Sequence, residues 1–195
     1  LMSEWESKLK AIVSEVKNED VGSMTGVPSW MMVLLQRTLA DTGKETIAEI
    51  WPNLEVFFHG GISFKPYRDQ YRKIIGKDIN YYEIYNASEG FFAIQDQPGS
   101  DEMLLMLDYG IFYEFIPMDA FDPDNLQAIP LEEVEIGKNY ALVITTNSGL
   151  WRYLIGDTVK FTSLQPYRIK ISGRTKHYIN AFGEELMIDN VETAL

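Results

Sequence analysis

The chain has 195 residues, of which 46% are hydrophobic, and this is enough for one sizeable core and part of a second domain. Its net charge of −12 is spread along the chain, which disfavours nucleic acid and anionic membrane as partners. It has no cysteine, so a disulfide framework and a zinc–thiolate site are excluded. Because we find neither a signal peptide nor a long apolar run, we expect a cytoplasmic protein.

The first forty residues predict two helices joined by a loop. Apolar side chains recur at helical spacing over residues 3–18, which predicts an amphipathic helix. Residues 18–26 are rich in turn-forming residues, and we interpret them as a loop because no strand precedes them and no Gly-Lys-Ser/Thr follows. Pro28 suits the first turn of a second helix that should stop near Gly43. Within that helix, Trp30 fits a core anchor better than a substrate contact.

The next segment predicts a strand–helix–strand unit. A short helix is expected over residues 44–50, followed by a strand over residues 54–58 that is apolar enough to be covered on both faces. Residues 66–75 form the next predicted helix, closed by Gly76, and residues 79–85 form the next strand. The order predicts that the two strands are parallel and adjacent.

Beyond Gly90 the pattern changes to short strands separated by turn signals. It predicts an antiparallel, barrel-like or strongly twisted β subdomain. Residues 117–138, which are acidic and contain three prolines, should form a surface excursion. Residues 145–149 resemble a phosphate loop, but strands flank both sides, so we expect a hairpin turn. The predicted strands span residues 91–94, 103–107, 111–116, 140–146, 150–155, 159–161 and 168–171.

The fold class expected is therefore α/β: a βαβ sheet-and-helix subdomain followed by a smaller antiparallel β subdomain. We place the α/β subdomain at residues 1–90 and the β subdomain at residues 91–172. Residues 173–195 would begin a hinge towards a further C-terminal domain.

Four strand-like runs end in glycine together with polar or charged residues. The main one is residues 81–90, Tyr-Tyr-Glu-Ile-Tyr-Asn-Ala-Ser-Glu-Gly; the others end at residues 59–63, 153–157 and 173–176. Small side chains at a strand end let a ligand approach the backbone, and Glu89 offers oxygen ligands to a hard cation such as Mg²⁺. Taken alone, the run over residues 81–90 is more typical of an ordinary strand end with a turn.

The ordered set resembles the adenylate-forming enzymes, the superfamily of acyl-CoA synthetases and firefly luciferase. Within it, Tyr-Asn-Ala-Ser-Glu-Gly and Tyr-Leu-Ile-Gly-Asp are similar to motifs of the auxin-responsive Gretchen Hagen acyl-acid amido synthetases, and bacterial-type relatives are the nearest in wording. The resemblance runs from about Val27 to the end of the chain. It implies a fragment of the large N-terminal domain, with ATP or AMP and Mg²⁺ as cofactors.

The resemblance also implies roles for individual residues around the nucleotide. Tyr85 would stack on adenine, although a core tyrosine is the plain alternative. Glu89 would bind Mg²⁺, and Asp157 would accept both ribose hydroxyls unless it is only a turn residue. The remaining nucleotide contacts would come from His59, Gly60, Gly61, Asn86, Ala87, Ser88 and Arg174, with Ser88 donating a hydrogen bond on the phosphate side. For His59, a structural, hydrogen-bonded histidine is the alternative.

Three more residues are assigned only through the resemblance. Val27 and Trp30 would lie near the acyl pocket, and Lys176 stands where the superfamily has its hinge residue. The family usually has glycine or another small residue where Asn86 stands, and many relatives have lysine where Asn180 stands, so the roles of both stay open.

The function implied is ATP-dependent adenylation of a carboxylic acid, followed by conjugation to an amine such as an amino acid. The carboxylate is itself the nucleophile, so the site needs no general base. The alternative is a non-catalytic nucleotide-binding or interaction module of the same fold. We find no phosphate loop upstream of Tyr85 and no catalytic lysine domain after Leu195, and we therefore expect the middle part of a longer enzyme.

Overall fold

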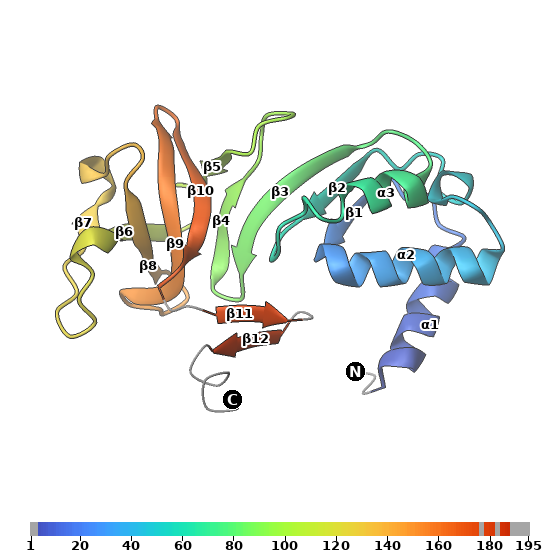
Figure 1. Cartoon of the computed structure of the whole chain (residues 1–195), viewed down its shortest axis with the longest axis horizontal. Coiled ribbons are helices and arrows are strands. Elements are labelled where there is room, and N and C mark those ends of the chain that lie inside the picture. Colours follow the sequence, from blue (N-terminus) through green and yellow to red (C-terminus); the bar gives the residue numbers. More distant parts are fainter. Residues whose placement is uncertain (1–3, 176–177, 182–183, 188–195) are drawn as a thin grey trace. The chain divides into compact units, whose positions relative to one another are not determined.

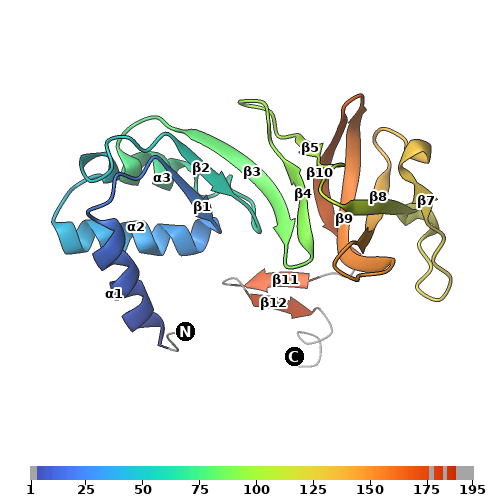
Figure 2. The ribbon, with the colours of Figure 1, turned by 180° about the vertical axis from the view of Figure 1, so that it is seen from behind.

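A computed structural model describes residues 4–175, 178–181 and 184–187. The chain divides into two compact units, residues 1–86 and 87–195. Unit 1 combines helices with parallel strands, and unit 2 consists mainly of antiparallel strands (Figure 1; Figure 2). The predicted α/β class, with a βαβ part followed by an antiparallel β part, is confirmed.

Unit 1 holds three helices and three parallel strands. The helices are α1 (Trp5–Val16), α2 (Pro28–Thr42) and α3 (Arg68–Ile75), with a 3-10 turn at Ile47–Glu49. The strands are β1 (Ser23–Gly26), β2 (Val56–His59) and β3 (Asn80–Ala87), paired in that order. Helices α2 and α3 are the crossovers between successive parallel strands, so the unit contains two overlapping βαβ motifs.

Strand β1 corrects the sequence prediction, which made residues 18–26 a loop. Met24 is buried, and Ser23 to Gly26 pair in parallel register with Val56 to His59. Asparagine, aspartate and glycine are depleted in strands, and residues 18–26 contain all three, so the composition of the segment indicates a loop. Pairing with β2 overrides that local preference.

The core of unit 1 lies between the strands and the two crossover helices. Met24 and Phe57 from the strands pack with Met32 and Leu35 of α2 and with Tyr71 of α3. Phe57 and Tyr71 stack with ring centroids 5.0 Å apart. The Tyr71 hydroxyl donates to the Pro28 carbonyl oxygen at 2.8 Å, which links α3 to the first turn of α2.

Helix ends in this unit follow the predicted chemistry. Pro28 occupies the first turn of α2, and Gly43 ends that helix in the left-handed conformation with φ of 67°. Gly76 ends α3 in the same way, with φ of 79°. Only glycine adopts this conformation at little cost, so both glycine stop signals are confirmed.

Trp30 is half exposed and does not anchor the core, so that expectation is wrong. Its ring meets Trp5 of α1 edge-on, with centroids 5.0 Å apart. A single apolar residue on a helix can serve either the core or the surface, and periodicity alone does not decide between them.

Unit 2 holds an antiparallel sheet with the strand order β4-β5-β10-β9-β8-β6-β7. The long strands are β8 (Asn139–Thr146), β9 (Tyr153–Leu164), β10 (Tyr167–Arg174) and β6 (Ile111–Pro117). The short strands are β4 (Gly90–Ile94), β5 (Met103–Leu105) and β7 (Ile129–Pro130). A separate pair consists of β11 (Tyr178–Ala181) and β12 (Glu184–Met187).

The turn over residues 145–149 is a hairpin connection, as predicted: the Thr146 amide bonds to the Leu150 carbonyl oxygen at 2.9 Å. In contrast, the two strands predicted over residues 150–155 and 159–161 are one continuous strand, β9. Gly156, with φ of 95°, suggests a break, but the strand passes through it as an irregularity.

The predicted surface excursion over residues 117–138 contains short structure of its own. It includes the 3-10 turns Met118–Ala120 and Leu131–Glu133 and strand β7, and Val134 is buried. Among the described residues, no helix is long and apolar enough to cross a membrane.

Candidate functional site

The predicted site residues fall into two groups, one in each unit. The first lies at the carboxyl ends of the parallel strands β1, β2 and β3, where Gly26, His59 and Glu83 share one register level. Open parallel sheets commonly bind ligands outside this edge. His59, Gly60, Gly61, Tyr85, Asn86 and Val27 belong to this group.

The glycine turn after β2 is built for close backbone approach. Gly60 is buried, and a side chain there would collide with the Ile84 carbonyl oxygen. Gly61 is exposed, with φ of 82°, and a Cβ atom at Gly61 would lie 3.4 Å from a Val27 methyl group. A Cβ atom at Gly60 would lie 3.5 Å from the Asn86 side-chain oxygen. The fold therefore brings Val27, Gly60, Gly61 and Asn86 together.

His59 is a buried neutral histidine. Its side chain is only 4% exposed and stacks on Phe64, with ring centroids 4.3 Å apart. Burial, together with the nearby positive charge of Arg68, lowers its pKa to about 4. Its Nδ1 atom has no hydrogen-bond partner among the described residues. The site thus has one buried polar atom available to a ligand or a water molecule, whereas a satisfied structural histidine would have none.

Tyr85 is buried, with 4% of its surface exposed, and makes at least one polar or ring interaction. The next residues, Asn86, Ala87 and Ser88, are exposed. Strand β3 continues to Ala87, and Ser88 and Glu89 form the turn before β4. Burial of this kind is typical of a core tyrosine, so stacking of Tyr85 on adenine stays a prediction.

The second group centres on an ion pair between β9 and β10. Asp157 and Arg174 are register partners, and the Arg174 Nε atom lies 3.1 Å from Asp157 Oδ1. The Asp157 side chain is 13% exposed and that of Arg174 is 40% exposed. The aspartate is therefore held in place by a cation, and a small part of its side chain is exposed to solvent.

Backbone irregularities aim this pair. The register between β9 and β10 shifts between Ile171 and Gly173, which places a bulge directly before Arg174. On the other strand, the carbonyl oxygen of Gly156 accepts hydrogen bonds from the Thr175 amide at 2.8 Å and from its hydroxyl at 3.2 Å. Bulges commonly redirect a side chain next to a site, and here they fix where Asp157 stands.

Glu89 lies in the turn between β3 and β4 and is partly exposed. No group of three or more metal-binding side chains occurs in the described part of the chain. Mg²⁺ in nucleotide enzymes is commonly held by one or two carboxylates together with phosphate oxygens, so one accessible glutamate fits such a role. Lys176 lies outside the described residues.

Sequence reasoning missed one feature, an ion pair between Arg152 and Glu114. Arg152 stands next to the recognised Tyr-Leu-Ile-Gly-Asp motif, yet its partner is 38 positions away. The local signal available is an arginine within a predicted short strand, which is too common to single out.

Two domains of one protein family match the sequence. The GH3 family N-terminal domain matches residues 1–79, and the GH3 family central domain matches residues 104–174. Together these segments cover most of the chain.

Relatives of the same family are found among curated proteins. The chain is 31% identical over 123 residues to indole-3-acetic acid-amido synthetase GH3.3 of Arabidopsis thaliana, covering 60% of this chain and 20% of that protein. It is 32% identical over 124 residues to jasmonoyl–L-amino acid synthetase JAR4 of Nicotiana attenuata, covering 58% and 21%. The chain therefore spans about a fifth of the length of these relatives.

Solved structures show the fold. The AtGH3.15 acyl acid amido synthetase in complex with 2,4-DB superposes with a TM-score of 0.66 at 15% identity, covering 95% of this chain and 41% of that one. A 2-hydroxyisobutyryl-CoA ligase in complex with 2-HIB-AMP and CoA gives a TM-score of 0.64 at 18% identity, covering 98% and 45%. The fold is thus that of the N-terminal domain of adenylate-forming enzymes, and the chain belongs to the GH3 family.

Proposed function

We propose that this chain is the nucleotide-holding part of an ATP-dependent acyl-acid amido synthetase. Such an enzyme joins a carboxylic acid to the α-phosphate of ATP and releases pyrophosphate. It then transfers the acyl group from the adenylate to an amine such as an amino acid and releases AMP. The observation that carries the proposal is the Asp157–Arg174 pair at the bulge between β9 and β10. The names of the relatives, amido synthetases of acyl acids, support the reaction class.

Asp157 suits the ribose of the nucleotide. A carboxylate has two acceptor oxygens and matches the two vicinal hydroxyls of a ribose. Arg174 bonds to Oδ1 through Nε and orients the carboxylate. The terminal guanidinium nitrogens of Arg174 carry positive charge and suit a phosphate or ribose oxygen.

The glycine turn suits the base and the phosphates. Without side chains, Gly60 and Gly61 let backbone amides and carbonyls approach a planar ligand edge. The unpartnered Nδ1 of neutral His59 can donate or accept one hydrogen bond, depending on its tautomer. Tyr85, Asn86, Ala87 and Ser88 complete the nucleotide contacts in this proposal, with Val27 and Trp30 towards the acyl acid.

Glu89 is the residue we assign to Mg²⁺, which would neutralise negative charge on the phosphates. The chain supplies positioning and charge, and the attacking carboxylate needs no deprotonation near neutral pH. Ser88, beside Glu89 in the same turn, supplies a hydroxyl donor on the phosphate side. Lys176 would act as the hinge, and the protein would function in the cytoplasm.

The test is ATP–pyrophosphate exchange by the intact protein across a panel of carboxylic acids. We expect exchange only when an acid is present, because exchange requires reversible adenylate formation. Glu89→Ala should reduce the exchange rate at least a hundredfold while the melting temperature stays within a few degrees, since removing an electrostatic stabiliser costs about 10²–10³ in rate.

The matched control is Glu55→Ala, an exposed carboxylate of unit 1 that should leave the exchange rate unchanged. Nucleotide binding without any exchange would favour the non-catalytic nucleotide-binding module. A Glu89→Ala variant that unfolds would make Glu89 a structural residue and remove the Mg²⁺ assignment.

A further inference from the structure

The outer face of strands β6, β8 and β9 has a small apolar core of its own. Ile116, Ala141 and Val143 are buried there, separately from the core of unit 1. The polypeptide after β6 folds back over this face and covers it with Met118, Phe121 and Ala128. The excursion over residues 117–138 is therefore a packed cover.

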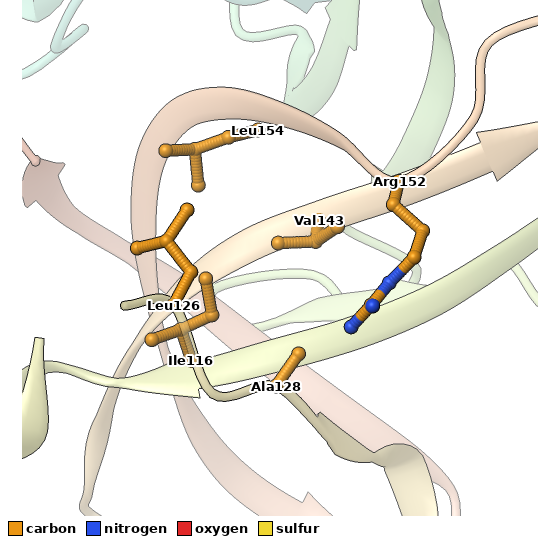
Figure 3. Close-up of a pocket in the computed structure, with 6 residues that line it drawn as sticks. All are labelled: Ile116, Leu126, Ala128, Val143, Arg152 and Leu154. Carbon is orange, nitrogen blue, oxygen red and sulfur yellow. The ribbon is translucent and has the colours of Figure 1, made fainter. Parts of the chain in front are cut away.

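This cover does not fill the space beneath it. A cavity of about 160 Å³ remains, lined by Ile116, Leu126, Ala128, Val143, Leu154 and Arg152 (Figure 3). An apolar cavity of about 150 Å³ is large enough for benzene, so this one takes a group of about five or six carbon atoms. Five of its six lining residues are apolar, and Figure 3 shows the nitrogen-bearing end of Arg152 extending beside Ala128.

The Arg152 backbone is fixed in an uncommon conformation. Its φ is 45°, and no other non-glycine residue in the described part of the chain has a positive φ. Its amide donates to the Thr145 hydroxyl at 3.0 Å across the hairpin. A bulky residue in this region costs about 1–2 kcal/mol relative to the right-handed conformation, so the hairpin contacts hold Arg152 where chain preference would not.

The Arg152 side chain is paired with Glu114 through one atom on each side. Nε donates to Glu114 Oε2 at 2.9 Å. Among the described residues, the terminal guanidinium nitrogens of Arg152 and the Oε1 atom of Glu114 have no bonding partner. The Arg152 side chain is 63% exposed and that of Glu114 is 18% exposed. Arg152 lines the apolar cavity, and its partner Glu114 lies next to it, so a cation at the cavity and an adjacent anion both have unused bonding positions.

From this arrangement we infer that the cavity binds an aliphatic α-amino acid. The carboxylate of such a ligand would bond to the terminal nitrogens of Arg152, its ammonium group to Glu114, and its side chain would fill the apolar cavity. A ligand with only a carboxylate would be repelled by Glu114, and a ligand with only an ammonium group would be repelled by Arg152. A ligand that carries both charges therefore fits best. Assigning this amino acid as the acceptor of acyl transfer rests on the proposed function, whereas its binding to the cavity does not.

The experiment is a titration of the protein, carrying ¹³C-labelled methyl groups, with L-leucine in the absence of ATP. The methyl resonances of Leu154 and Val143 report directly on the cavity. We expect saturable shifts with L-leucine, and affinities at least tenfold weaker for 4-methylpentanoate, which lacks the ammonium group, and for 3-methylbutylamine, which lacks the carboxylate. Glycine, which has no side chain to fill the cavity, should leave the Leu154 methyl resonances nearly unshifted.

Two variants and one control test the charged pair. Arg152→Asn introduces a residue that tolerates a positive φ, and Glu114→Gln preserves the size of the side chain. Each variant should lower the affinity for L-leucine at least tenfold. The control, Arg72→Gln, removes a more exposed pair with Asp78 in unit 1 and should change nothing. If the Arg152 variant misfolds, Glu114→Gln still decides.

Equal affinity for L-leucine and 4-methylpentanoate, or no saturable shift with L-leucine, would overturn the inference and leave the proposed adenylation intact. L-leucine binding together with absence of acid-dependent pyrophosphate exchange would support the site and count against the proposed function.

Discussion

The two groups of site residues are built by opposite means. In unit 1 the site is made by removing side chains, because Gly60 and Gly61 leave the backbone bare at the strand ends. In unit 2 it is made by adding charge, because Asp157 and Arg174 face each other across two strands. A backbone surface depends on tight packing beneath it, whereas a charged pair at the surface can be altered with little effect on folding.

The strongest test of this contrast is Gly60→Ala. The new methyl group would collide with the Ile84 carbonyl oxygen, which is backbone and cannot rotate away. We expect the free energy of unfolding to fall by about 3 kcal/mol, at the upper end for an overpacked site. Urea denaturation measures it.

The matched control is Gly22→Ala in the same unit. A Cβ atom there would lie 3.8 Å from its nearest neighbour, the Asn53 carbonyl oxygen, which is ordinary contact. We expect a change within about 0.5 kcal/mol. Equal destabilisation by both variants would show that the Gly60 turn is not packed as described.

Asp157→Ala should have the reverse profile, with binding lost and folding kept. Losing hydrogen bonds to a charged acceptor should weaken AMP binding by about 1.5–3 kcal/mol. A 2′,3′-dideoxy analogue should lose much less, because it never made those bonds, and Asp157→Asn should fall between the two. Calorimetry with both ligands measures this; equal losses would make Asp157 a residue that shapes the turn after Ile155.

A smaller effect is expected from pH. The folded pKa of His59 is about 4, below the ordinary value of 6.5, because of burial and the charge of Arg68. The unfolded chain therefore binds a proton at higher pH than the folded chain does, so stability is complete above pH 6.5 and is lost as the pH falls towards 4. Between pH 6.5 and 5.5 the loss should be about 1 kcal/mol.

His59→Phe isolates this effect, because phenylalanine keeps the stacking on Phe64 and carries no proton. The difference in unfolding free energy between the native protein and this variant should change with pH over that interval. A constant difference would mean that His59 has the same pKa in the folded and the unfolded chain.

Local chemistry predicted much of unit 1 from the sequence. Helical periodicity gave α1 and α2, glycine gave the ends of α2 and α3, and the strand–helix–strand order gave the parallel pairing of β2 and β3. Strand β1 was missed because its stability comes from pairing with β2, about thirty residues further along, and not from its own composition.

The candidate site was predictable only in part. Sequence motifs identified Asp157 and Arg174 separately, and the apolar run before Gly60 and Gly61 identified the Gly-Gly turn. That the two charged residues are register partners depends on the bulge in β10, which shifts the pairing after Ile171. The pairing of Arg152 with Glu114 likewise depends on the register of β6, β8 and β9, and no local pattern encodes it.

The placement of the tryptophans gives each unit its own optical signal. Trp51 is 2% exposed, and its indole nitrogen donates to the Val16 carbonyl oxygen at 3.0 Å, whereas Trp151 is 82% exposed and directly precedes Arg152. A soluble quencher such as iodide should therefore reach Trp151 and spare Trp51. Trp5 and Trp30 of unit 1 are 42% and 52% exposed and would be quenched as well, so both must be replaced by phenylalanine before the quenchable emission reports events beside the Arg152 cavity. A red shift of the protected Trp51 emission would report opening of unit 1.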